Sequence, residues 1–288
     1  MTTGAPDRAA VPPAPGTAVA TYVFAVRPGD GPSCPPEASG LCPDTPVRLL
    51  PVGSLGVVVQ SVPAADYSAE SLRDRLADPV ELERCAREHH AVVCAAARGA
   101  TVVPMPLATV YHDDERTRAA LLARERELSA ALRRLAGRAE WGVKVYTGTQ
   151  AGSTAGPDRA ALAGAEDGAT GRAPSGRAYL ERVRGRQRAR EQRQEAVLRA
   201  ADRVDDRLRP LAVAARRLRA HGAEPAGDRR SQVLNAAYLL DAGRERELAG
   251  TVRELRAAPE LRDVRIEVSG PWVPYSFVEG GADDSGGD

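Results

Sequence analysis

The amino-acid sequence predicts an α+β fold in two domains, on three observations. The chain has 288 residues, of which 43% are apolar, so it is long enough to build two cores. Short β-branched runs typical of strands occur in both halves, and so do longer runs with apolar residues at helical spacing. We therefore expect a small mixed α+β domain over residues 19–138 and a second domain over 139–278. Residues 1–18 and the acidic residues 279–288 are expected to be a disordered leader and tail.

The first domain is predicted to begin with strands. Thr21–Val26 is a short apolar run rich in β-branched and aromatic residues. Val47–Val52 and Leu55–Val62 are two further runs, separated only by Gly53 and Ser54, which is the spacing of a β-hairpin. These runs predict a small antiparallel sheet.

Helices follow the hairpin. Ser68 is a predicted N-cap, and Asp78 followed by Pro79 predicts the start of a second helix, in which Leu82, Cys85, His89 and Val92 share one face. A brief strand is expected at Thr101–Val103. The acidic residues from Asp113 onward predict one further helix that ends at Gly137.

The second domain has an order of elements that predicts its topology. A strand at Glu140–Tyr146 precedes a flexible insert at 147–174 and a long helix from Ser175 to Pro210. Residues 211–218 are compatible with either helix or strand. A strand at 231–240, a helix at 243–258 and a strand at 264–268 complete the domain. If 211–218 is a strand, the order is βαββαβ, a modified ferredoxin-like domain with one long helix.

Aromatic residues concentrate near the C-terminus, where Trp272, Tyr275 and Phe277 are three of only eleven in the chain. Pro271 and Pro274 favour an extended arm over a helix at 269–278. The rings either close onto the chain's own domain as a clasp or contact a partner protein. Their position after the last strand favours a plug for the C-terminal core. Tyr179 and Trp141 are the other candidate contact residues.

No catalytic residue, cofactor site or metal site is predicted. The sequence has no phosphate-binding loop, nucleophile elbow or zinc-ribbon spacing, so we expect no enzyme. Cys85 with His89, and His90 with Cys94, are four residues apart, but each pair lacks two further ligands. Free thiols and ordinary imidazoles are expected instead.

Charge and targeting patterns exclude several partner classes. The net charge is +1, no signal peptide or membrane span is recognisable, and a cytoplasmic protein is expected. Residues 177–219 hold fourteen arginines against six carboxylates, which would suit a nucleic-acid-binding helix. Because interleaved aromatic residues are missing, a solvated helix is favoured and no nucleic-acid partner is expected.

The sequence resembles the gas vesicle protein L/F family. Matching segments run through most of the chain in order, including Glu88-His89-His90, Pro104-Met105-Pro106-Leu107, Glu140-Trp141-Gly142-Val143, Ser175-Gly176-Arg177-Ala178-Tyr179, Leu234-Asn235-Ala236-Ala237-Tyr238 and Gly270-Pro271-Trp272-Val273-Pro274-Tyr275. The chain departs from the usual pattern at Val273, where the family carries proline.

The resemblance implies a protein of the gas vesicle or cytoplasm that assists vesicle assembly without catalysis. It implies binding to the major gas vesicle shell protein and to other accessory gas vesicle proteins, and a variable region at the insert. A regulatory module that binds a small ligand through the ferredoxin-like domain is the alternative, because a fold alone does not decide a function.

Overall fold

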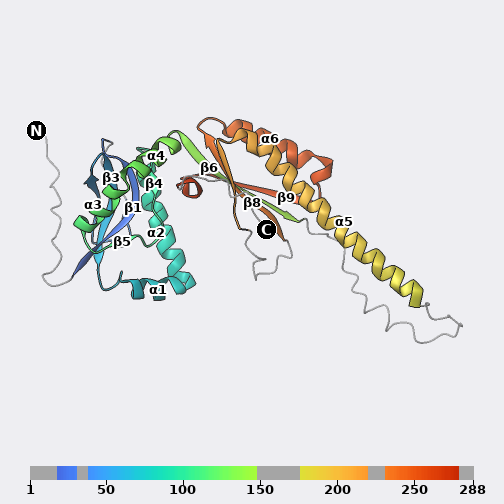
Figure 1. Ribbon diagram of the computed structural model, residues 1–288, viewed down its shortest axis with the longest axis horizontal. Helices are drawn as coiled ribbons and strands as arrows, with labels where there is room; N and C mark the ends of the chain where they lie inside the picture. The colour runs from blue at the N-terminus through green and yellow to red at the C-terminus, as the bar shows by residue number, and fades with distance from the viewer. Residues whose placement is uncertain (1–17, 31–37, 148–175, 220–230, 279–288) are drawn as a thin grey trace, which may run out of the picture. The chain divides into compact units, whose positions relative to one another are not determined.

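The computed structural model describes residues 18–30, 38–147, 176–219 and 231–278 (Figure 1). These residues belong to two compact units. Unit 1 combines Met1–Glu140 with Pro271–Asp288, and unit 2 is Trp141–Gly270. Three predicted segments lie outside the described residues: the leader at 1–18 except Ala18, the insert at 147–174 except Thr147, and the acidic tail at 279–288.

An antiparallel sheet forms the centre of unit 1. Its order is β2-β3-β1-β4, and β5 also pairs with β1. The strands are β1 (Val19–Pro28), β2 (Val47–Val52), β3 (Leu55–Pro63), β4 (Val103–Pro104) and β5 (Val110–Tyr111). The predicted first strand and hairpin are confirmed, and Gly53 takes the positive φ of 57° that the tight turn requires. The short β5 was not predicted.

In its described ranges, unit 1 also has the α-helices α1 (Ala69–Ala77), α2 (Pro79–Ala97), α3 (Asp114–Ala123) and α4 (Glu125–Leu135). The side chains of Ser68 and Asp78 cap α1 and α2 as predicted. The single helix predicted from Asp113 to Gly137 is wrong, because the chain breaks at Arg124. The carboxylate of Glu125 there accepts hydrogen bonds from the backbone N–H and the hydroxyl of Ser54, both at 2.7 Å. This contact ties the start of α4 to the hairpin turn.

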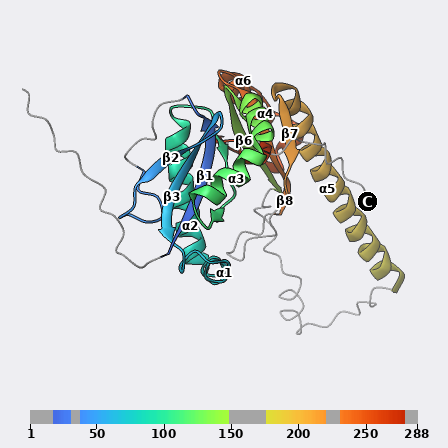
Figure 2. The ribbon, with the colours of Figure 1, turned by 60° about the vertical axis from the view of Figure 1, so that its left-hand side comes forward.

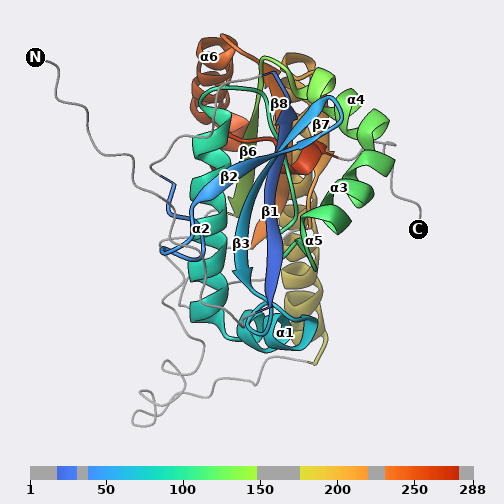
Figure 3. The same cartoon turned by 90° about the vertical axis from the view of Figure 1, so that its left-hand side faces the viewer.

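The helices of unit 1 flank its sheet. Figure 3 shows α2 along one side of β1 and β3, with α3 and α4 along the other. The helix α2 buries Cys85, His89, Val92 and Val93 as its spacing predicts. Leu82 is on the predicted apolar face but is exposed.

Unit 2 also has an antiparallel sheet, with the order β7-β8-β6-β9. Its elements, in chain order, are β6 (Arg138–Thr147), α5 (Gly176–Leu208), β7 (Ala214–Arg217), β8 (Gln232–Asp241), α6 (Glu245–Ala257) and β9 (Val264–Trp272). The ambiguous region 211–218 is therefore mainly a strand, after a 3-10 turn at Arg209–Leu211.

Among the residues of the long helix α5 whose side chains are described, those in the core of unit 2 belong to its last turns. Ala200, Ala201, Val204 and Leu208 are buried there with Tyr238 and the apolar residues of α6. Its earlier turns extend beyond the end of the sheet (Figures 1 and 2). The arginines described on these turns are exposed, as expected for a solvated helix.

One charged group lies inside this core. The carboxylate of Asp205 accepts hydrogen bonds from the hydroxyl of Tyr238 at 2.6 Å, from Arg209 at 3.0 Å and from Arg217 at 3.0 and 3.1 Å. Burial by itself would raise the pKa of Asp205, but these hydrogen bonds outweigh it and hold the pKa below its usual value. The charge is therefore retained inside the fold.

Candidate functional site

The C-terminal arm, Pro271–Val278, packs against unit 1. The interpretation of these residues as a plug for the C-terminal core is therefore wrong. Val273 lies against the core that Tyr22, Phe24 and Val92 form between β1 and α2. The predicted extended conformation holds as far as Trp272, the last residue of β9, but Tyr275–Phe277 form a 3-10 turn.

Three kinds of contact fasten the arm. Ser276 donates its backbone N–H and its hydroxyl to the carboxylate of Glu140, at 2.8 and 2.7 Å. Arg134 donates to the backbone carbonyls of Phe277 and Val278, at 3.2 and 2.8 Å. Phe277 is buried, with 4% of its surface exposed. Burial raises the pKa of Glu140, although the bonds from Ser276 act in the opposite direction.

Two rings of the fastened arm remain on the surface. Trp272 is 46% exposed and Tyr275 is 38% exposed. Both lie against the imidazole of His90 on α2, with ring centroids 5.9 and 5.8 Å away. The hydroxyl of Tyr275 is 3.1 Å from Nδ1 of His90. We call these three residues the aromatic patch.

Cys94 borders the aromatic patch. Its sulfur lies 3.3 Å from Nε2 of His90, so the two side chains meet as their spacing of four predicts. Burial raises the pKa of Cys94, which favours the neutral thiol. Within the described ranges no group of three or more His, Cys, Asp or Glu residues is arranged to hold a metal ion.

The other pair of cysteine and histidine at a spacing of four, Cys85 and His89, is buried in the core of unit 1. Nε2 of His89 lies 3.1 Å from the carbonyl of Met105, which only accepts hydrogen bonds, so Nε2 carries the proton. Nδ1 then accepts from the hydroxyl of Tyr22 at 3.0 Å. Burial lowers the pKa of His89 to about 4, and the imidazole is neutral.

Because His89 is buried as a neutral imidazole, we expect the protein to lose free energy of unfolding in mild acid. An unfolded histidine has a pKa of about 6.5, so between about pH 6.5 and pH 4 the unfolded chain binds a proton that the folded chain excludes. Between pH 7 and pH 5 the free energy of unfolding should fall by about 2 kcal/mol from this residue. Urea denaturation of His89→Gln should show a correspondingly flatter pH dependence, whereas the exposed His112→Gln should not. Equal slopes for both variants would contradict the assignment.

The remaining candidate residues are not brought to the patch. Trp141 is half-buried and packs against the core of unit 2. Tyr179 belongs to α5, and its side chain lies outside the described part of the structure. Sequence reasoning missed the contacts of His90 and Glu140 with the arm, which join residues 185 and 136 positions apart. No local pattern signals such contacts.

Comparison with known proteins agrees with the resemblance. The family model described as gas vesicle synthesis protein GvpL/GvpF matches residues 20–279. Gas vesicle protein L of Streptomyces sp. (strain CB03234) is 39% identical over 261 residues, which cover 89% of this chain and 92% of that protein. Gas vesicle protein F of the same strain is 27% identical over 263 residues, covering 91% and 100%.

Solved structures share the fold. The crystal structure of GvpF from Anabaena sp. PCC7120 matches with a TM-score of 0.61 at 18% identity, over 91% of this chain and 97% of that one. GvpF from Microcystis aeruginosa matches with a TM-score of 0.56 at 17% identity, over 90% and 99%. The chain belongs to the GvpL/GvpF family of gas vesicle proteins and has a role in gas vesicle formation.

Proposed function

We propose that this protein acts in gas vesicle formation by binding the major shell protein and other accessory gas vesicle proteins, without catalysis. The observation that carries the proposal is the aromatic patch, two large exposed rings fixed on a folded surface. Rings held in place before binding lose little conformational entropy when a partner covers them. Exposed Trp and Tyr are also the residue types that contribute most to protein interfaces.

A shell protein is a suitable partner for such a surface. The wall of a gas vesicle presents apolar surface to the gas, so an unassembled shell subunit exposes apolar area that aggregates in water. Covering this area with Trp272 and Tyr275 would keep the subunit available for assembly. Binding would take place in the cytoplasm or at the vesicle. None of the helices in the described ranges combines the length and apolar character that a bilayer crossing needs.

Unit 2 is proposed to be a ferredoxin-like domain. Its elements follow the order βαββαβ, and its first strand, β6, lies next to its last, β9. The end of β6 is joined to the start of β8 by the N–H of Thr147, which donates to the carbonyl of Ser231. This fold is used for many purposes, so the binding role is assigned to the patch and not to the fold.

Removing the two exposed rings tests the proposal. The double variant Trp272→Ala/Tyr275→Ala should weaken capture of the shell protein by at least about tenfold, because central aromatic anchors contribute about 2 kcal/mol each. The melting temperature should change by less than about 3 °C, since the anchoring contacts of Ser276 and Phe277 remain. The matched control is Leu122→Ala, which removes an equally exposed apolar side chain from α3. Unchanged capture by the double variant, or equal loss in the control, would reject the patch.

A further inference from the structure

Arg27 is a buried arginine inside unit 1. It lies one residue before the end of β1, and only 1% of its surface is exposed. Its Nε and Nη2 atoms are closed to solvent, and neither has a hydrogen-bond partner among the described residues. No ion pair within the described ranges includes Arg27 either. Because arginine keeps its charge in proteins, a full positive charge is enclosed here.

The side chains on the same face of the sheet as Arg27 are apolar. Arg27 pairs with Gly56 of β3, and two positions earlier Ala25 pairs with Val58. Alternate residues of a strand share a face, so Arg27 lies on the face of Ala25 and Val58. These two residues belong to the core that the sheet forms with α2, and so does Val102 just before β4. Such side chains offer a guanidinium neither an acceptor nor a negative charge.

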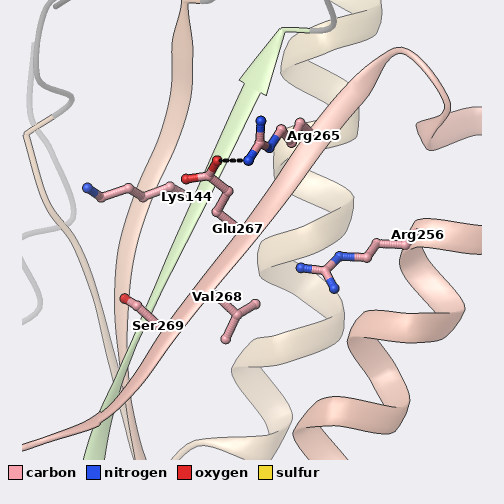
Figure 4. Close-up of a pocket in the computed structure, with 6 residues that line it drawn as sticks. All are labelled: Lys144, Arg256, Arg265, Glu267, Val268 and Ser269. Carbon is pink, nitrogen blue, oxygen red and sulfur yellow. Dashed lines mark ion pairs between the residues drawn. The ribbon is translucent and has the colours of Figure 1, made fainter.

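Arginines of unit 2 show the partners that such a group takes. Arg265 pairs with Glu267 at 2.8 Å (Figure 4). Arg256 donates through Nε and Nη2 to the carbonyl of Ile266, at 3.2 and 2.7 Å. Both arginines are exposed, so water is available to them as well. A buried charge without a counter-charge is far more costly than an exposed one, so Arg27 has the greater need of a partner.

The two nitrogens of Arg27 that lack partners indicate the shape of a ligand. Nε–H and Nη2–H point in parallel from one edge of the guanidinium, and this edge binds two oxygens of a carboxylate or phosphate at once. Water accepts a hydrogen bond but brings no negative charge. A phosphate group at pH 7 carries more charge than one arginine neutralises, and its other oxygens would face apolar side chains. A carboxylate has one charge and two oxygens, so it matches this edge.

We propose that Arg27 binds a small free carboxylate, of the size of formate or acetate, inside unit 1. A small molecule can enter through a transient opening near the end of β1, whereas an acidic side chain of a partner protein would need a lasting gap. Binding would neutralise the buried charge and stabilise unit 1. Unit 1 also carries the aromatic patch, but the carboxylate site does not depend on the role proposed for that patch.

Thermal unfolding of the full-length protein in sodium formate tests this proposal. Chloride replaces formate at constant total sodium concentration and pH 7, so that ionic strength stays fixed. Formate should raise the melting temperature by about 3–5 °C for each tenfold increase above its Kd, and NMR titration of isotope-labelled formate should saturate. No rise, or an equal rise in sodium phosphate at the same sodium concentration, would overturn the proposal.

Variants of Arg27 locate the site. Arg27→Met should abolish the effect of formate and, without formate, should be at least as stable as the wild type, because an apolar group replaces an unpaired buried charge. Arg27→Lys keeps the charge but loses the edge with two nitrogens, and should weaken formate binding by at least about tenfold.

The matched control is Arg48→Met on β2, which removes an arginine whose partner is the carboxylate of Asp114 at 2.7 Å. It should respond to formate as the wild type does, even if its melting temperature is lower. An undiminished response in Arg27→Met, or an equal loss in Arg48→Met, would reject the site. If Arg27→Met fails to fold, the NMR titrations of the wild type and of Arg27→Lys decide the question, and equal affinities would reject it.

Discussion

Asp205→Ala is expected to lower the free energy of unfolding of unit 2 by about 3 kcal/mol. Asp205 is 2% exposed and is the shared acceptor of Tyr238, Arg209 and Arg217. Alanine would leave the buried hydroxyl of Tyr238 without its acceptor and two guanidinium groups without their counter-charge. Both arginines are at least half exposed, so water replaces part of what they lose, and the expected loss is at the lower end for a broken buried pair.

Two further variants test whether the loss comes from the hydrogen bonds of Asp205 or only from removing a negative charge. Asp206→Ala removes an exposed carboxylate at the next position of α5 and should cost less than about 0.5 kcal/mol. Tyr238→Phe removes one donor but leaves Asp205 paired with both arginines, and should cost about 1–2 kcal/mol. Urea denaturation measures all three values. A loss below about 1 kcal/mol for Asp205→Ala would show that the network does not stabilise the fold.

Glu140→Ala is expected to release the C-terminal arm and to cost about 2–3 kcal/mol. The change leaves the N–H and hydroxyl of Ser276 without their acceptor and removes one of the contacts that hold the buried Phe277 in place. Hydrogen exchange of residues 271–278 should become faster. Urea denaturation gives the accompanying loss in stability.

Glu140→Gln is the matched control for this loss. Glutamine keeps a carbonyl acceptor for the N–H of Ser276 and offers its amide N–H to the serine hydroxyl. Because burial raises the pKa of Glu140, the stability linked to it is greatest below its unfolded pKa and is lost as the pH rises through the folded pKa. A neutral glutamine should therefore leave unit 1 at least as stable as the wild type at pH 7. Equal release of the arm by both variants would contradict this account.

Local signals explain what could be predicted of the fold. The caps at Ser68 and Asp78, the turn at Gly53 and the end of the long helix before Pro210 each depend on a few adjacent residues. The break between α3 and α4 at Arg124 could not be predicted from adjacent residues. The group that ties down the next helix at Glu125 is Ser54, 71 residues earlier.

The candidate site on the C-terminal arm was also predictable only in part, because its contacts join residues that are far apart in the sequence. The sequence singled out Trp272, Tyr275 and Phe277 but left open whether they pack or bind. In the structure Phe277 is buried, whereas Trp272 and Tyr275 remain exposed. Both the burial and the exposure depend on contacts of the arm with Glu140 and His90, which are far away in the sequence.

By itself, the sequence determined the family, the α+β class and the strands and helices of unit 2 apart from residues 211–218, which only the structure assigned to a 3-10 turn and a strand. These depend on motifs and on periodicity, which are properties of neighbouring residues. Only the tertiary structure decided that the arm packs on unit 1, that Asp205 keeps its charge inside a core and that β9 is an edge strand. Each of these depends on contacts between residues far apart in the chain, and such contacts exist only once the elements have packed together.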